Sequence, residues 1–338
     1  EVQVCRGEGA TEHVSATEVT SFTRAAHSAP PRQLVFSPSG ERLLSVSGRR
    51  RRRQGGTPDW GHGDLRVFDV RSGKQVGLHD PGEIDLRAVG VVLDDAGEPL
   101  IAQGVYKRPS RILRAPHGVV EPPLEIPSDK WEPVSELEQG ELGTHRVAFV
   151  PGPTRAGGPH VVTLGVGRDS KLKLWSLADA KKPVPTVLKG VSRGEACLAV
   201  DPKGDFAIIG GADSRLTLVE LFPGTEPRDD IDLASSMPKG EEPLQRVDFL
   251  LVSPDSRTAY LTGFCHLRDE RRTRFVMRVD LRPDAPKPVA KFVEVEGYRL
   301  RGLVFGAGNH LISGDNDSPG MDGSRGLGPS HFRVFSQT

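Results

Sequence analysis

The sequence predicts a nearly all-β protein built from one repeated unit of strands. Three observations lead to this prediction: apolar segments of 4 to 8 residues, the turn residues that bound them, and the recurrence of one cassette along the 338 residues. Short strands joined by many turns have this pattern, whereas helices need longer periodic segments.

Glycine and proline support the prediction of strands. Together they account for 67 of 338 residues, 39 Gly and 28 Pro, and they are spread through the apolar segments instead of forming a low-complexity tract. Helix interiors tolerate both residues poorly. We therefore expect strands and turns over most of the chain.

The cassette begins with an apolar strand that runs into a turn rich in Pro, Asp, Ser and Gly. Its six copies are Leu34–Gly40, Val91–Gly97, Val147–Gly152, Leu198–Gly204, Leu251–Ser256 and Leu303–Gly308. Equivalent positions in these strands, 36, 93, 149, 200, 252 and 305, are separated by 57, 56, 51, 52 and 53 residues. Such even spacing indicates one supersecondary unit stacked against copies of itself.

Two further strands follow each turn. The second strand is apolar, as in Arg42–Val46, Val161–Leu164, Phe206–Ile209, Ala259–Thr262 and His310–Ser313. The third alternates between apolar and polar residues, as in Leu65–Val70, Lys171–Leu177, Arg215–Leu221, Arg274–Leu281 and Phe332–Ser336. Because an alternation of period 2 buries one face of a strand, we expect the aromatic residues at core positions of the first and third strands to pack between blades. They include Phe36, Phe68, Phe149, Trp175, Phe305 and Phe335.

The third strands carry a resemblance to a known family. Lys171–Leu177 and Leu65–Val70 resemble the Trp-Asp strand of WD40 repeats, and the resemblance covers about residues 30 to 336. It implies a β-propeller of four-stranded blades. The chain departs from the family because no cassette has a Trp-Asp pair and because its repeats exceed the usual length of about 40 to 45 residues. The Gly-His dipeptide that precedes a repeat in the family is also missing. Gly61-His62 lies inside the first cassette and not before it. The hydrogen-bond network that the dipeptide builds in the family is therefore not predicted here.

The resemblance also implies how the last blade is completed. In this family the segment before a repeat supplies the outer strand of the preceding blade, so we expect the β-prone residues 13–22 to complete the sixth blade and close the ring. This predicts one propeller domain over residues 1–338, with an N-terminal extension and closing strand in 1–30 and six repeats in 31–336. A seventh blade supplied from outside the chain is the alternative.

The long loops predict a binding face. In such blades the loops between strands two and three, and the connections from strand four to the next blade, emerge on the same face. The longest are residues 48–63, 127–144, 234–245, 264–273 and 315–330. Elaborated loops on a rigid scaffold are where binding residues usually lie.

Charges of opposite sign are separated on these loops. The basic residues are Arg49, Arg50, Arg51, Arg52, Arg53, Lys107, Arg108, Arg268, Arg271 and Arg272, and the acidic ones are Glu132, Glu136, Glu138, Glu141, Glu241 and Glu242. We predict that Arg49 to Arg53, with Lys107, Arg108, Arg271 and Arg272, bind a protein partner that has an acidic contact segment. Trp60 and Trp131 are predicted aromatic anchors. The alternatives are solvated charged loops and tryptophans that form a loop's own small core.

These features favour a non-catalytic protein-interaction module, a scaffold or a sensor or regulatory subunit, alone or within a larger chain or complex. One alternative is a propeller hydrolase such as a glycosidase or lactonase, which needs carboxylates or a metal gathered at the mouth of the central channel. Another is nucleic-acid binding through residues 49–53. The sequence has no phosphate-binding loop, nucleophile elbow or zinc-binding helix motif, which favours the first reading, and no cofactor is expected.

The segment from Asp315 to Gly323 is the candidate for a metal site. Asp315, Asp317 and Asp322 offer hard oxygen ligands of the kind that Ca²⁺ prefers. Their order does not match the helix-loop-helix calcium loop, and Asp, Asn, Pro and Gly are also common in ordinary loops. These three residues are therefore weak candidates, and we expect no metal.

Overall composition excludes some classes of partner. The chain has 45 Lys+Arg against 45 Asp+Glu and a pI near 7.4, which argues against a general nucleic-acid or membrane-surface binder. No apolar run approaches the length of a membrane span. Cys5, Cys197 and Cys265 are too scattered for a disulfide framework or a zinc site, so we expect a reducing, cytoplasmic location.

Overall fold

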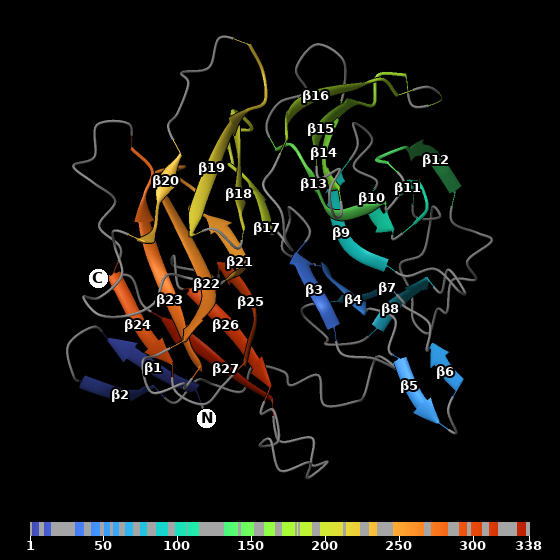
Figure 1. Ribbon diagram of the computed structural model, residues 1–338. Coiled ribbons are helices and arrows are strands. Elements are labelled where there is room, and N and C mark those ends of the chain that lie inside the picture. Colours follow the sequence, from blue (N-terminus) through green and yellow to red (C-terminus); the bar gives the residue numbers. More distant parts are fainter. Residues whose placement is uncertain are drawn as a thin grey trace. The chain divides into compact units, whose positions relative to one another are not determined.

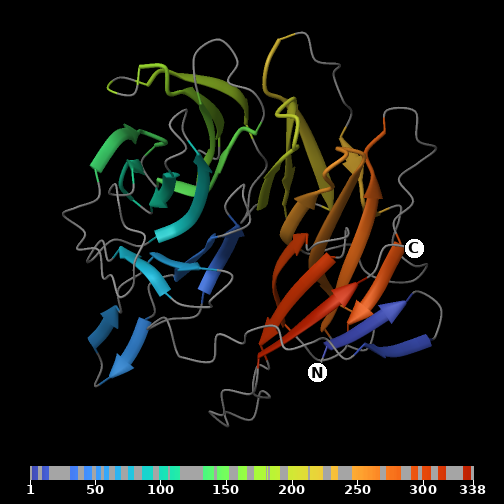
Figure 2. The same ribbon diagram turned by 180° about the vertical axis from the view of Figure 1, so that it is seen from behind.

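The computed structural model consists almost entirely of β-strands (Figures 1 and 2). It describes residues 2–6, 10–14, 31–36, 42–47, 51–54, 57–60, 65–69, 75–79, 86–93, 99–105, 107–114, 132–140, 143–151, 159–165, 171–179, 181, 183–190, 197–211, 214–223, 230–234, 246–266, 272–282, 291–295, 299–305, 311–316 and 330–335. Up to residue 60 and from residue 291 onward, it describes the main chain alone. Within these ranges there is no helix of the length and apolar character needed to cross a membrane.

The chain divides into two compact units. The first-half unit is Thr20–Arg193, and the second-half unit combines Glu1–Val19 with Gly194–Thr338. In the described residues each unit contains three sheets that begin with a first strand of the predicted cassette, and the first-half unit also contains a two-stranded sheet.

The three cassette sheets of the first-half unit each have four antiparallel strands in chain order. The first sheet consists of β3 (Pro31–Phe36), β4 (Arg42–Ser47), β7 (Leu65–Asp69) and β8 (Gln75–His79). The second consists of β9 (Leu86–Leu93), β10 (Pro99–Val105), β11 (Ser110–Arg114) and β12 (Glu132–Leu137). The third consists of β13 (Thr144–Phe149), β14 (His160–Gly165), β15 (Lys171–Ser176) and β16 (Pro185–Gly190).

A two-stranded ribbon is inserted into the first sheet between β4 and β7. It pairs β5 (Arg51–Gln54) with β6 (Thr57–Trp60) and forms part of the segment that the sequence predicted as a plain loop over residues 48–63. Because β4 still pairs with β7, the ribbon is an excursion from the sheet and not one of its strands.

The second-half unit repeats the same arrangement. Its first sheet consists of β17 (Cys197–Val200), β18 (Phe206–Gly210), β19 (Arg215–Glu220) and β20 (Ile231–Asp232), and its second of β21 (Arg246–Val252), β22 (Thr258–His266), β23 (Arg272–Asp280) and β24 (Lys291–Val295). The last sheet has five strands, ordered β25 (Arg299–Phe305), β26 (Leu311–Asn316), β27 (Ser330–Phe335), β1 (Val2–Arg6) and β2 (Ala10–Val14).

An N-terminal strand does join the last sheet, as predicted, but it is a different segment from the expected one. β1 lies next to β27, dark blue beside red in Figure 1, and pairs with it in parallel through Gln3 with Arg333 and Val4 with Val334. The prediction that residues 13–22 occupy this place is wrong. Only His13 and Val14 of that segment are described, and they belong to β2, on the outer side of β1.

Where side chains are described, the predicted alternation of the third strands holds over their first residues; the next two residues are both buried, so both faces are covered there. β15 and β19 have the same burial pattern, with Leu172, Leu174 and Trp175 buried in one and Leu216, Leu218 and Val219 in the other. Each such side chain that leaves water contributes about 1.5 to 3 kcal/mol to folding. The same burial in both units shows that the repeat is structural as well as sequential.

The sheets pack face to face within each unit. One core cluster joins the second and third sheets through side chains that include Ile112, Leu137, Phe149 and Trp175. A second joins the two four-stranded sheets of the second-half unit through Cys197, Val247 and their neighbours. Phe68, Phe149 and Trp175 are 8%, 7% and 2% exposed, which confirms their predicted core role.

Candidate protein-interaction surface

The antiparallel order gives every sheet two distinct ends. At the turn end, strand one turns into strand two and strand three connects to strand four. At the loop end lie the connections between strands two and three and those from strand four to the next sheet. In the first-half unit the loop end carries the β5–β6 ribbon, the turn 106–109 and the connection 138–143.

Two cations of the predicted interface lie on the turn between β10 and β11. Lys107 and Arg108 are both exposed, and Lys107 has a φ of 56°, a backbone conformation that costs energy for a residue with a side chain. Gly143, with a φ of 75°, packs directly against this turn. A Cβ on Gly143 would overlap the carbonyl oxygen of Val105 and lie 2.8 Å from the nitrogen of Lys107. The connection 138–143 therefore packs against the turn that carries Lys107 and Arg108, which we call the cationic turn.

The same connection is tied to the third sheet by a buried hydrogen-bond network. The Trp175 Nε1 donates to Thr163 Oγ1 at 2.7 Å, and this hydroxyl donates in turn to the Oε1 of Gln139. The Gln139 Nε2 then donates to the carbonyl oxygen of Lys171 at 2.6 Å. The sequence predicted no such network because the Gly-His dipeptide of the family is missing. In its place Gln139, in the connection before the third repeat, holds the hydrogen bonds together.

A pair of lysines continues the positive charge along β15. Lys171 is exposed, while Lys173 lies 5.4 Å from the centre of the Trp175 ring and donates to the carbonyl oxygen of Glu138 at 2.8 Å. Partial burial and repulsion from Lys171 hold the pKa of Lys173 below its usual value, against an opposing attraction from Glu138. Lys171 and Lys173 therefore place two positive charges on β15, the third strand of this sheet.

The remaining predicted basic residues are described in part. Arg51 to Arg53 lie on β5, where Arg51 is in register with Trp60 on β6. Arg272 begins β23 in the second-half unit, in register with His266. Arg49, Arg50, Trp131, Arg268 and Arg271 lie outside the described residues.

Two of the predicted acidic loop residues lie on a strand. Residues 127–144 were predicted as a connection, but β12 occupies Glu132–Leu137. There Glu136 pairs with Arg111 at 3.3 Å and Glu132 with Arg114 at 3.7 Å, both across the β11–β12 ladder. The prediction that these two glutamates belong to a free acidic loop is wrong, because they already neutralise arginines of the neighbouring strand. Glu138 is exposed on the connection, and Glu141, Glu241 and Glu242 lie outside the described residues.

The candidate metal ligands are barely described. Asp315 lies on β26 in register with His331, whereas Asp317 and Asp322 fall outside the described residues. In the part of the chain whose side chains are described, no three His, Cys, Asp or Glu side chains gather as metal ligands would.

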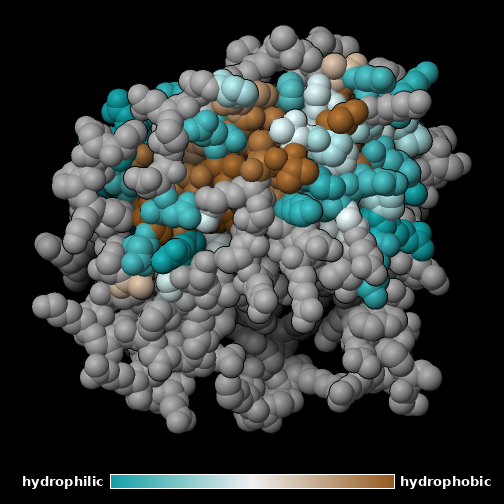
Figure 3. Space-filling model, turned by 45° about the horizontal axis from the view of Figure 1, so that its top comes forward, coloured by the Kyte–Doolittle hydropathy of each residue, from teal (hydrophilic) through white to brown (hydrophobic). Residues whose placement is uncertain are grey.

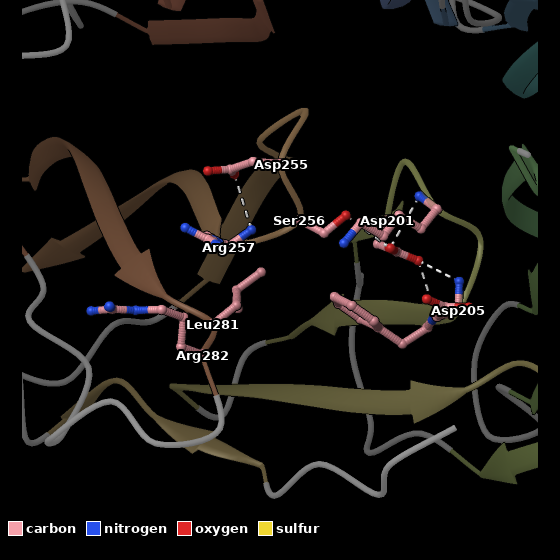
Figure 4. Close-up of a pocket in the computed structure, with 9 residues that line it drawn as sticks. Asp201, Asp205, Asp255, Ser256, Arg257, Leu281 and Arg282 are labelled. Atoms are coloured by element: carbon pink, nitrogen blue, oxygen red, sulfur yellow. Dashed lines mark hydrogen bonds between the residues drawn. The ribbon is translucent and has the colours of Figure 1, made fainter. Parts of the chain in front are cut away.

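A second buried network lies at the turn end of the second-half unit (Figure 4). Asp201 is fully buried and its carboxylate accepts from the main-chain nitrogens of Lys203, Asp205 and Phe206 at 3.1, 2.6 and 3.0 Å. It also accepts from Ser256 Oγ of the equivalent turn of the next sheet, at 3.0 Å. Ser256 itself has a φ of 61°. This link between two turns was missed from the sequence, although the recurring Asp-Pro and Ser-Pro turns were its signal.

A shallow pocket of about 210 Å³ opens between these two turns. Phe206 and Leu281 form its apolar lining, and Lys203, Arg257 and Arg282 bring positive charge to it. Arg282 is held by Asp280 at 2.6 Å, and Asp255 accepts from Ser253 Oγ at 2.5 Å and from the nitrogen of Arg257 at 3.1 Å. Asp255 is thus bonded within its own turn, whereas Asp201 links the two turns through Ser256.

Comparison with solved structures decides the fold. The chain is similar to the β-propeller domain of Cps50 (Swd1) from Myceliophteria thermophila, with a TM-score of 0.54 and 10% sequence identity over 86% of this chain and 81% of that one. The fold is a β-propeller. The sheets of both units are therefore propeller blades, as the WD40 resemblance implied. No family model matches the sequence, and no curated protein does.

Proposed function

We propose that this propeller is a non-catalytic protein-interaction module, a scaffold or regulatory subunit, that binds its partner at the loop end of its blades. The observation that carries the proposal is the cationic turn, where Lys107 and Arg108 are exposed to solvent on a backbone that Gly143 supports. Exposed groups held on a rigid scaffold lose little conformational entropy on binding.

The partner's contact segment is acidic and partly apolar. Arg49 to Arg53 and Lys107 and Arg108 meet its carboxylates, with Arg271 and Arg272 contributing from the second-half unit. Arginine suits this role because its planar guanidinium pairs with a carboxylate through two hydrogen bonds and also stacks on aromatic rings. Trp60, which ends β6, and Trp131 supply aromatic anchors.

Affinity capture followed by mass spectrometry tests the proposal. The wild-type chain is compared with a variant in which Arg49 to Arg53 are replaced by Ser and with a second variant carrying Lys107→Ser and Arg108→Ser. Lys203→Ser with Arg257→Ser, two exposed cations of the turn end, is the matched control. A partner is accepted if both loop-end variants lose it and the control keeps it; capture that is equal in all four chains contradicts the proposal.

Association and dissociation rates separate the roles of the basic residues and the anchor. Replacing a rim arginine should mainly slow association and reduce its salt dependence. Trp60→Ala should instead speed dissociation, costing about 1 to 3 kcal/mol of binding free energy. Unrelated duplex DNA is the competing ligand. If it bound with a steep salt dependence and the five-serine variant lost this binding, the partner would be a nucleic acid and not a protein.

A further inference from the structure

The outer strand of the third blade exposes apolar side chains. β16 is the last strand in the order β13-β14-β15-β16, so one of its edges faces no other strand of this sheet. Val187 on this strand is 54% exposed and Val184, just before it, is 78% exposed; among the described side chains these are the exposed large hydrophobic ones. On the face shown in Figure 3, hydrophobic groups likewise reach the surface beside hydrophilic ones. An edge strand with exposed apolar residues is a template for pairing with another strand.

The charge around this edge restricts what can occupy it. Residues 171–190 contain five lysines and one aspartate. Lys173 is in register with Val187, so the two side chains lie on the same face of the sheet, and Lys171 follows on that face. A second copy of the same edge would bring like charges together, whereas an acidic segment would neutralise them.

Another blade shows that a sheet of this chain can extend beyond four strands. In the last sheet β27 is followed by β1 and then by β2, which makes five strands. The added strands come from a segment distant in sequence and pair through the main chain. Edge addition is therefore already part of this fold.

We propose that β16 accepts an extended, acidic segment of a protein partner as an additional strand. On the face that carries Val187 and Lys173, that segment places an apolar side chain beside Val187 and, two residues along, a carboxylate beside Lys171 and Lys173. A further apolar side chain covers Val184, just before the strand. Pro183 and Pro185 have no N–H to donate, so main-chain pairing is confined to residues 186–190. The edge of β16 is separate from the cationic turn, so this proposal does not depend on the proposed function.

A labelled peptide of seven residues, Glu-Thr-Val-Thr-Glu-Thr-Val, is a direct probe, because its Glu and Val side chains all lie on one face of an extended strand. Fluorescence anisotropy should show binding to the full chain that weakens with salt. The double variant Val184→Ser with Val187→Ser should bind at least tenfold more weakly, and Val184→Ile with Val187→Ile should bind within twofold of wild type. Lys171→Ser should weaken binding severalfold, whereas Lys107→Ser with Arg108→Ser should leave it unchanged.

Two controls separate edge pairing from simple charge attraction. A peptide with Ser in place of every Val keeps the charge and should bind at least tenfold more weakly. Bound peptide should also slow hydrogen exchange of the amides of residues 186–190. Equal binding of the Val and Ser peptides, equal binding by the double-serine variant, or unchanged exchange in β16 would overturn the proposal.

Discussion

The buried networks at the two ends of the blades differ in how many of their bonds are local in the chain. At the turn end Asp201 accepts three bonds from main-chain nitrogens two, four and five residues ahead and one long-range bond from Ser256, 55 residues away. At the loop end Gln139 reaches Thr163 and Lys171, which are 24 and 32 residues away. A local network can form wherever its turn sequence occurs, whereas a long-range network exists only once the blade is folded. The turn end therefore contributes mainly to stability, and the loop end positions the connection that supports the cationic turn.

The largest effect is expected from Asp201→Ala. Loss of the carboxylate leaves three main-chain nitrogens and Ser256 Oγ without their acceptor, in a fully buried place. We expect a loss of about 3 kcal/mol in the free energy of unfolding, measured with urea and far-UV circular dichroism. Asp255→Ala, in the equivalent turn but exposed, is the control and should cost less than about 1 kcal/mol.

The same variant tests the prediction of a single domain. Trp60, Trp131 and Trp175 all lie in the first-half unit, so tryptophan fluorescence reports on that unit while Asp201 lies in the other. In a single cooperative domain, Asp201→Ala shifts the fluorescence and circular dichroism transitions together. A fluorescence transition that stays at the wild-type urea concentration would show two independently unfolding units.

Gly143→Ala should have the next largest effect, at the loop end. The new Cβ would overlap the carbonyl of Val105, and the φ of 75° strains any residue with a side chain. We expect a loss of about 2 kcal/mol and displacement of the turn that carries Lys107 and Arg108. Gly140→Ala is the comparison: its φ of 147° also strains a residue with a side chain, but a Cβ there meets nothing within 4 Å, so the difference between the two variants reports the overlap at Gly143. Equal unfolding curves for the two variants would contradict the close packing described for Gly143.

Gln139→Met should cost about 1.5 kcal/mol, because the volume is kept while Thr163 and the carbonyl of Lys171 lose their partner. The change should appear in the tryptophan fluorescence transition, since Trp175 donates into this network. An unchanged transition would mean that the network adds nothing to the stability of the third blade.

The smallest expected effect is on the loss of stability at low pH. The hydroxyl of Ser253 holds the pKa of Asp255 below its usual value, and Arg282 does the same for the pKa of Asp280. Their contribution to stability is therefore complete above the unfolded pKa of about 3.9 and is lost as the pH falls through the lower folded pKa. Asp280→Asn should flatten the acid limb of a plot of urea midpoint against pH. Because both groups lie near the surface, the change should be small. An unaltered acid limb would show that the pair of Asp280 and Arg282 does not contribute to stability.

The same contrast explains what could be predicted from the sequence. The six first strands and the third strands depend on local patterns, and the described residues include all of these strands. Of the predicted tight turns, those at residues 201–205 and 253–257 are described, and both are closed by main-chain hydrogen bonds. β12 was missed because Glu132, Pro133 and Glu136 are residues typical of a loop. They are compatible with β12 because it is the outer strand, and one of its edges faces no other strand of its sheet. The β5–β6 ribbon was missed because Arg51 to Arg53 show no apolar alternation.

The network around Gln139 could not be predicted, because its partners come together only in the folded blade. From the equivalent positions 93 and 149, the strand pairing puts Ile101 of the second blade in the place of Thr163. Gln103 lies two residues further on, and its buried Nε2 has no hydrogen-bond partner among the described residues. The repeat thus fixes the backbone of each blade, while each blade fills its polar positions differently.

The most direct test of the account measures stability and partner binding on the same pair of charge variants. Lys107→Ser with Arg108→Ser at the loop end is compared with Lys203→Ser with Arg257→Ser at the turn end, using the captured partner and urea unfolding. The account predicts that the loop-end pair weakens binding and its salt dependence while the free energy of unfolding stays within about 0.5 kcal/mol of wild type. The turn-end pair should leave both quantities unchanged. Loss of binding in the turn-end pair, or full binding in the loop-end pair, would contradict the assignment of binding to the loop end.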